Sequence, residues 1–187
     1  LTITAVADTK EYIRTTASAG VPTLTSGAIQ GSDSVTWTQT FDNWNVGSGK
    51  TLTPAGVVTD GNSGNNYSYT YTPVATGVIT AKAITGNFTV DATRVYDGGA
   101  SANVLTRTLN NVISGDTVTL TGGTASYNNK NVGTGKTVTL SGASLADTDA
   151  GNYTLSSVAT TTADITARPL TITAVADTKE YIRTTAS

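Results

Sequence analysis

The sequence predicts an all-β fold made of two tandem sandwich modules, and two features of the chain support this prediction. Thr alternates with Val, Ile, Leu and Tyr in short runs, which places apolar side chains on one face of a strand and threonines on the other. Pairs such as Gly-Gly, Asn-Asn and Asp-Gly interrupt these runs at roughly 8 to 12 residues, the spacing of strands in an antiparallel sandwich or barrel. Another small β-rich fold, such as a β-grasp, is the alternative.

The expected strands follow from this alternation along the chain. They include residues 1–6 (LTITAV), 118–120 (VTL), 137–140 (TVTL) and 164–167 (DITA). Branching at Cβ favours an extended backbone in each of them. No long stretch repeats apolar residues at the 3.6-residue period of a helix, and Gly interrupts every candidate. We therefore expect almost no helix.

Two internal repeats define the organisation of the chain. Residues 1–18 recur unchanged from position 170, a shift of 169. Inside this period, NVGSGKT at position 45 recurs as NVGTGKT at position 131, a shift of 86. Units of this length exceed the roughly 20 to 45 residues of a solenoid repeat and suit small domains in tandem. We therefore divide the chain into a first β module at 1–83, a second at 84–169, and the first strand region of a further copy at 170–187.

The composition argues against several classes of function. The chain has no Cys, His or Met, which removes disulfides, thiol nucleophiles and the usual general bases. Charged residues are 13% of the chain and the Lys and Arg are scattered, so we expect no nucleic-acid partner. No apolar run is long enough to span a bilayer, so we expect no membrane insertion by this segment. We predict that the protein is not an enzyme and uses no catalytic or cofactor-binding residues.

A turn followed by a tyrosine is the most informative local motif. In immunoglobulin-type sandwiches, a Tyr just after such a turn packs its ring under the corner and binds upstream backbone through its hydroxyl. Asp149-Ala-Gly-Asn-Tyr153 fits this pattern, and the first module has Gly-Asn-Asn-Tyr67 at the matching place. We expect Asp149, Tyr153 and Tyr67 to have structural roles in two immunoglobulin-like sandwiches. The alternative is an ordinary turn followed by a strand tyrosine.

A set of motifs in the second module points to a known family. In order they are YDG at 96–98, SGDTVTL at 114–120, NVGTGKTVTL at 131–140, DAGNYTL at 149–155 and ADITARPLTI at 163–172. Together they resemble the YDG and related MBG-type repeats of very large secreted bacterial adhesins and filamentous haemagglutinin-like proteins. The resemblance covers nearly all of the second module. In the first module, Tyr12-Ile13-Arg14 stands where these repeats have Tyr-Asp-Gly.

This resemblance implies an extracellular location on the bacterial cell surface and no catalytic site. The implied role is structural: a stiff stalk that projects a distal binding region, or a segment that mediates cell-surface or biofilm contact. Neighbouring repeats of the same chain are the expected partners. A host or matrix glycan or protein is a further expected partner.

Acidic loops offer candidate calcium ligands, because a hard cation prefers several carboxylate and carbonyl oxygens in a flexible loop. Asp60 lies in one such loop, and Asp147 and Asp149 lie in another. Neither loop has the ligand spacing of a calcium-binding loop. The alternative is that these residues form turns and that no metal binds.

Aromatic residues concentrate in the first module and raise a second functional hypothesis. Trp37 and Trp44, with several tyrosines, could offer flat rings to a sugar, and Trp44 lies beside the expected turn at position 45. A small sandwich also needs large rings in its core, which is the competing explanation. Glycan binding by the first module is therefore kept as the alternative function.

Overall fold

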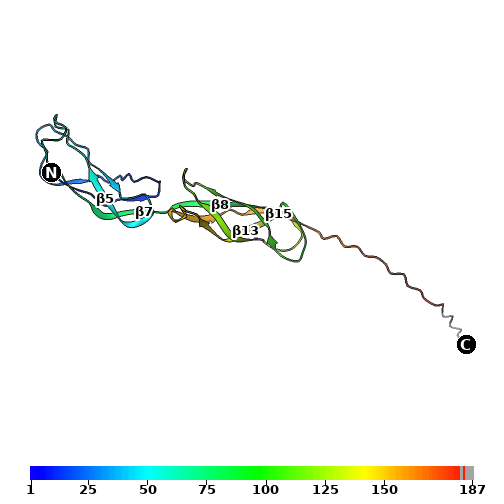
Figure 1. The fold of residues 1–187 in the computed structure, drawn as a ribbon. Coiled ribbons are helices and arrows are strands. Elements are labelled where there is room, and N and C mark those ends of the chain that lie inside the picture. The colour runs from blue at the N-terminus through cyan, green and yellow to red at the C-terminus, as the bar shows by residue number, and fades with distance from the viewer. Residues whose placement is uncertain (182, 184–187) are drawn as a thin grey trace.

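The chain folds into two β modules placed end to end, followed by an extended segment (Figure 1). The computed structural model describes residues 1–181 and 183. Strands form nearly all of the regular structure, and the only helical piece in the described residues is a three-residue 3-10 turn, η1 (Ala150–Asn152). The predicted all-β, sandwich-like fold is confirmed. Within the same residues, no helix is long and apolar enough to cross a bilayer.

The first module comprises two sheets formed from residues 2–80. The three-stranded sheet has the order β3 (Thr23–Ser26), β1 (Thr2–Thr4), β6 (Thr70–Thr72). The four-stranded sheet has the order β2 (Thr9–Glu11), β7 (Val74–Thr80), β5 (Gly47–Ala55), β4 (Thr38–Phe41). The change to the sheets of the second module falls at Ala81, between β7 and β8.

The second module also has two sheets, formed from residues 82–166. The three-stranded sheet has the order β11 (Val104–Asn110), β8 (Lys82–Val90), β14 (Tyr153–Val158). The five-stranded sheet has the order β10 (Ser101–Ala102), β12 (Thr119–Tyr127), β13 (Gly133–Ala146), β15 (Thr161–Thr166), β9 (Thr93–Val95).

The two modules repeat one topology. β1 runs parallel to β6 as β8 runs parallel to β14, and β2 runs parallel to β7 as β9 runs parallel to β15. The antiparallel pair β4 and β5 corresponds to the pair β12 and β13. Because the first and last strands of each module run in the same direction, the chain enters a module at one end and leaves it at the other.

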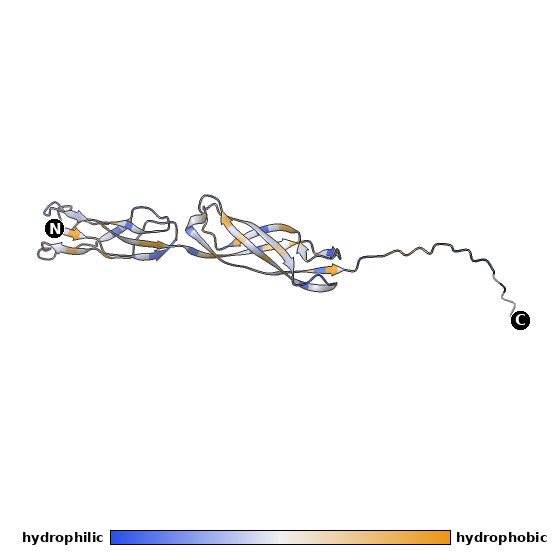
Figure 2. Cartoon of the chain, turned by 90° about the horizontal axis from the view of Figure 1, so that it is seen from below, coloured by the Kyte–Doolittle hydropathy of each residue, from blue (hydrophilic) through white to orange (hydrophobic). Residues whose placement is uncertain are grey.

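The alternation of Thr with apolar residues gives the strands one buried face and one exposed face, as expected. In β13, Val138 and Leu140 are buried while Thr137 and Thr139 are exposed. Hydrophobic and hydrophilic residues alternate in this way along the strands of both modules (Figure 2). One face of each strand is therefore available for a core between the sheets.

The hydrophobic core has two clusters. One lies inside the second module and consists of Phe88, Ala125, Tyr127, Val138, Leu140, Ala163 and Ile165. The other crosses from one module to the next and consists of Ala5, Tyr12, Phe41, Leu52, Ile79, Ile84 and Tyr153. Since Ile84 and Tyr153 belong to the second module, the two modules share part of one core.

The segment after the second module has the sequence of β1 and β2 but not their structure. Residues 170–181 form no strand, and Ile172 is 93% exposed, whereas its identical counterpart Ile3 is fully buried. In the first module β1 is paired with β3 and β6, whereas residues 170–181 pair with no strand. The predicted strand region continues to residue 187, but residues 182 and 184–187 lie outside the described residues.

Candidate functional site

The most developed site of the molecule is the contact between its two modules, here called the joint. It is formed by Tyr12, Arg14, Asn45 and Val46 of the first module and by Ile84, Asp116, Asn152 and Tyr153 of the second. β7 ends at Thr80 and β8 begins at Lys82, so a single residue connects the modules. The connection is therefore too short to act as a flexible linker.

Aromatic and aliphatic side chains form the centre of the joint. Tyr12 and Ile84 are fully buried, and Tyr153 is 6% exposed. The rings of Tyr12 and Tyr153 meet edge to face, with centroids 5.5 Å apart and an interplanar angle of 76°. Aromatic pairs favour this arrangement, which adds about 0.5–1.5 kcal/mol to the effect of burial.

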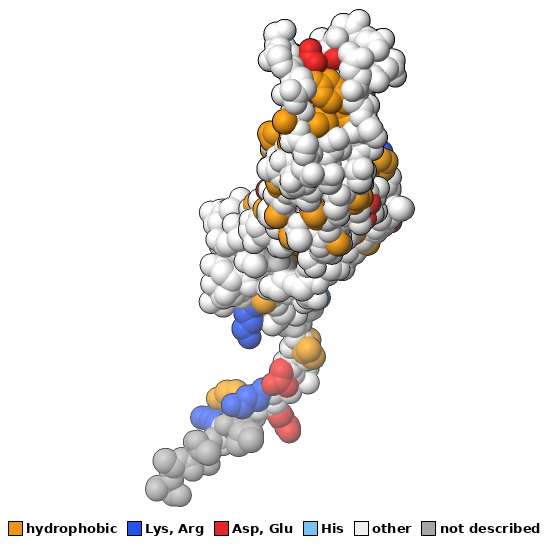
Figure 3. Space-filling view, turned by 90° about the vertical axis from the view of Figure 1, so that its left-hand side faces the viewer, with side chains coloured by type: hydrophobic (Ala, Val, Ile, Leu, Met, Phe, Trp, Pro, Cys, Tyr) orange, Lys and Arg blue, Asp and Glu red, His pale blue; other side chains and the backbone are white. Residues whose placement is uncertain are grey.

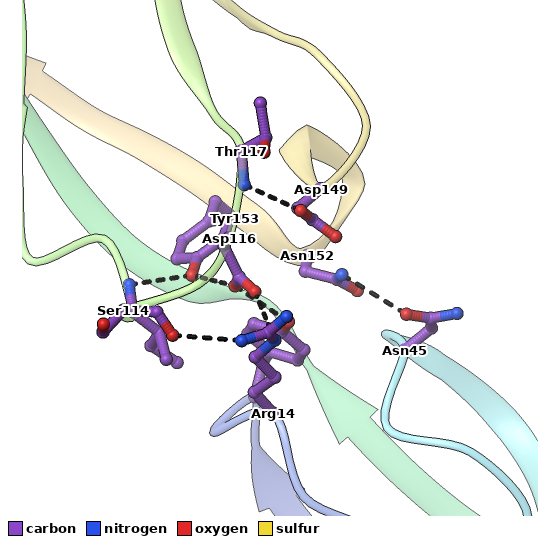
Figure 4. Close-up of polar contacts among 10 residues, drawn as sticks. Arg14, Asn45, Ser114, Asp116, Thr117, Asp149, Asn152 and Tyr153 are labelled. Carbon is purple, nitrogen blue, oxygen red and sulfur yellow. Dashed lines mark hydrogen bonds and ion pairs between the residues drawn. The ribbon is translucent and has the colours of Figure 1, made fainter.

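The carboxylate of Asp116 is the polar centre of the joint (Figure 4). Its side chain is fully buried. The hydroxyl of Tyr12 donates to Oδ2 at 2.9 Å, and the hydroxyl of Tyr153 donates to the same oxygen at 2.5 Å. The Tyr153 hydroxyl also accepts the backbone N–H of Ile113 at 3.0 Å. A buried carboxylate needs hydrogen-bond donors in place of water. Tyr12 of the first module supplies one of these donors to Asp116 of the second.

Arg14 supplies the charge that balances Asp116. Its Nε lies 2.9 Å from Asp116 Oδ1 in an ion pair, although the two atoms are not aligned for a hydrogen bond. Its Nη1 donates to the carbonyl of Ser114 at 3.1 Å. The backbone of Arg14 has a positive φ of 59°, a conformation that residues other than Gly rarely adopt. The guanidinium thus contacts two residues of the neighbouring module, Ser114 and Asp116.

Amide groups close one edge of the joint. The backbone N–H of Val46 donates to Oδ1 of Asn152 at 2.9 Å, and the side-chain amide of Asn152 lies 3.4 Å from Asn45 Oδ1. On the surface, Lys82 pairs with Glu11 at 3.0 Å. Exposed pairs of this kind contribute little, about 0–1 kcal/mol, so the buried contacts dominate the joint.

The protonation of the two tyrosines is tied to this geometry. Burial and then the hydrogen bond to Asp116 raise the pKa of Tyr153 to about 12. The same two causes, in the same order, raise the pKa of Tyr12 well above its ordinary value. Both hydroxyls therefore stay protonated as donors at neutral pH.

Each module of the chain matches the same known family. The YDG domain matches residues 1–75 and again residues 80–163. The chain belongs to the YDG domain family. Comparison with curated proteins and with solved structures gave no match. The two matched segments lie on either side of the junction between the modules, so each module is a YDG domain.

The tripeptide that names the family forms a closed turn in the second YDG domain. Asp97 accepts the backbone N–H of Gly99 at 2.9 Å and pairs with Arg94 at 3.0 Å, and Gly98 has a φ of 88°. In the first YDG domain, Arg14 occupies the place of Gly98. The residue that departs from the family tripeptide, Arg14, is therefore the one that pairs with Asp116 in the joint.

The predicted corner tyrosines lie at matching places in the two YDG domains. Tyr153 lies in the joint, and Asp149 beside it accepts the backbone N–H of Thr117 at 2.8 Å. Tyr67 lies at the opposite end of the first domain, where its hydroxyl accepts the backbone N–H of Gln30 at 2.9 Å. Both hydroxyls thus bind upstream backbone.

The candidate calcium ligands lie in two separate domains. Asp60 belongs to the first YDG domain, and Asp147 and Asp149 belong to the second. Both oxygens of Asp60 accept backbone N–H groups of its own loop, which outweigh desolvation and lower the pKa of this carboxyl. Among the described residues, no group of three or more His, Cys, Asp or Glu side chains could hold a metal ion.

The candidate glycan ligands differ in exposure. Trp37 is half-buried and meets the ring of Tyr69 edge to face, at 6.4 Å and 74°. Trp44 is 45% exposed and precedes Asn45 of the joint. Strand β4 separates the two indoles along the chain, and Trp37 packs on Tyr69 while Trp44 lies beside the joint.

The central polar residues of the joint escaped the sequence analysis. Asp116 was visible only as part of a family motif, and Tyr12 and Arg14 only as a departure from one. Their contact joins positions 104 residues apart. Two sequence features could have indicated the contact. Arg14 replaces the glycine of the family tripeptide in the first module, and the second module has an Asp, Asp116, that could pair with it.

Proposed function

We propose that this chain is a structural repeat of an extracellular bacterial adhesin. In this role, tandem YDG domains form a stiff stalk that projects a distal binding region from the cell surface or mediates cell-surface or biofilm contact. The role is mechanical rather than catalytic. Its partners are neighbouring repeats and, at the ends of the assembly, a host or matrix glycan or protein.

The observation that carries this proposal is the shared core of the joint. A stalk needs neighbouring domains that resist bending, and interfaces within a chain resist bending when they are buried and hydrophobic. Here Tyr12 and Ile84 are fully buried between the domains, and a buried carboxylate binds groups from both. The exact recurrence of residues 1–18 at position 170 supports a tandem array.

Small-angle scattering tests the stiffness of the stalk. The expected result for this chain is the distance distribution of two aligned domains followed by an extended tail. The matched control carries a short Gly-Ser insertion after Ala81, which separates β7 from β8 without changing either domain. The control should give a broader distribution with a smaller mean length. Identical distributions for the two proteins would refute a rigid joint and, with it, the stalk.

Glycan binding by the first domain is the second candidate, and the exposure of Trp44 is the observation in its favour. A sugar stacked on this ring should protect it from a soluble quencher and shift its fluorescence. A Trp44→Phe variant should lose both responses, while a Trp37→Phe variant should keep them. No response to a glycan panel in the unmodified protein would leave the structural role alone.

A further inference from the structure

We propose that the free end of the first domain is a docking surface for the far end of a second domain from a preceding copy of this sequence. This inference rests on the proposed tandem array and specifies its second type of joint. In that joint, Tyr96 of one copy donates a hydrogen bond to Asp33 of the next, as Tyr12 donates to Asp116 in the joint already described.

The free end of the first domain reproduces the acceptor side of the joint. The residues are Gln30, Asp33 and Tyr67, and their counterparts in the second domain are Ile113, Asp116 and Tyr153. Tyr67 donates to Asp33 Oδ2 at 2.7 Å and accepts the N–H of Gln30 at 2.9 Å. In both domains a turn places the aspartate N–H 3.1 Å from the carbonyl three residues earlier. The same acceptor is therefore built twice.

The two acceptors differ in what covers them. The side chain of Asp116 is fully buried and Tyr153 is a buried residue, whereas Tyr67, the counterpart of Tyr153, is only half-buried. Figure 3 looks onto this end of the molecule and shows hydrophobic side chains, with acidic ones beside them, in a hollow between two projecting loops. Val57, in one loop there, is 55% exposed. An apolar surface around an acidic acceptor is what the joint buries elsewhere in the same chain.

The far end of the second domain carries the matching donor. The backbone N–H of Tyr96 donates to Thr166 at 2.9 Å, as that of Tyr12 donates to Thr80 at 2.9 Å. Each tyrosine thus follows the second strand of its domain, β2 or β9, and lies beside the end of the last strand. Tyr96 is half-buried, and Val132, the counterpart of Val46, is 54% exposed. Both groups are therefore available to another domain.

A pair of positions makes the two joints different from each other. In the observed joint, a Cβ at Gly115 would lie 1.9 Å from Nη1 of Arg14, so the arginine needs glycine opposite it. The matching turn of the first domain has Ser32 in place of Gly115 and has its positive φ at Gly31 (58°) instead, and the second domain has Gly98 in place of Arg14. The contact between arginine and glycine is therefore specific to the observed joint.

This pairing favours alternation of the two domain types. If two first domains met, Arg14 would face a turn whose backbone differs from the one it contacts in the observed joint. If two second domains met, Asp116 would lack the ion pair with Arg14, and the carbonyl of Ser114 would lack its hydrogen bond from Arg14, both of which the observed joint provides. Alternation of unlike domains also prevents identical neighbours from exchanging strands.

A protein with two copies in tandem, residues 1–169 followed by residues 1–187, tests the proposal. Asp33→Asn is placed either in the first copy, where no domain precedes it, or in the second copy, where a Tyr96 precedes it. The first variant weakens only the local bond from Tyr67, because a neutral amide oxygen replaces the carboxylate as acceptor. The second variant also weakens the bond from Tyr96 to this charge, so its unfolding constant should rise about tenfold more. Equal effects in the two positions would overturn the proposal.

Scattering from the single chain reports on the stalk through the observed joint alone, so failure of the proposed function is recognised separately from failure of this inference.

Discussion

Replacing Tyr12 by Phe removes one hydroxyl from the joint and leaves the ring in place. The ring keeps its burial and its edge-to-face contact with Tyr153. The hydrogen bond to the buried carboxylate of Asp116, 2.9 Å long, is lost. A hydrogen bond to a charged group contributes about 1.5–3 kcal/mol to the free energy of unfolding. The variant should be less stable by this amount.

Urea unfolding followed by tryptophan fluorescence measures this loss. Both tryptophans, Trp37 and Trp44, lie in the first domain, so their signal reports on the domain that carries Tyr12. With a slope of roughly 1–3 kcal/mol per molar urea, the midpoint should fall by about 1 M. Circular dichroism of the same samples follows both domains together.

Tyr96→Phe is the matched control. Tyr96 occupies the place of Tyr12 in the second domain, where Phe would keep the packing of the ring against the core, and among the described residues its hydroxyl has no side-chain hydrogen bond. Its loss should change stability by no more than about 0.5 kcal/mol, as for most surface changes. If the two variants lose the same stability, the hydroxyl of Tyr12 does not stabilise the joint and the reasoning is refuted.

Three further changes probe the same region. Stability should be constant up to about pH 10 and fall as the pH rises toward 12, because folding raises the pKa of Tyr153 from 10.0 to about 12; urea midpoints across this range, with tyrosinate absorbance, check the window. Ile84→Ala should cost about 2–5 kcal/mol in thermal unfolding, whereas Leu105→Ala, at a side chain 55% exposed, should cost little. Gly115→Ala should destabilise the protein by more than about 1 kcal/mol, through its φ of 93° and the clash with Arg14, and by less in an Arg14→Gly background; equal losses in both backgrounds would contradict the clash.

The fold could be predicted because its signals are local. Alternation in residues such as Thr137 to Leu140 gives the strand and its buried face without knowledge of the partner strands. The parallel pairing of β1 with β6 could not be predicted in this way, since it depends on contacts across most of a module. Strand content is thus readable from one sequence, and strand order is not.

The candidate sites show the same limit. Asp60 looks alike in sequence whether its oxygens bind a cation or the amides of its own loop, and here they bind the amides. Asp116 looks like an ordinary turn residue until Tyr12 and Arg14 are placed against it by the fold. Residues whose partners lie in another module have no local signature.

The parallel pairing of first and last strands determines how a pulling force acts on each domain. Tension enters through β1 and β2 and leaves through β6 and β7, which run parallel to them; β8 and β9 stand in the same relation to β14 and β15. The force therefore slides neighbouring strands past each other, and it loads all the hydrogen bonds between them at once. An antiparallel pair pulled from its open end would instead lose these bonds one at a time. The geometry makes each domain a shear clamp, so a chain of such domains should hold its folded length under load.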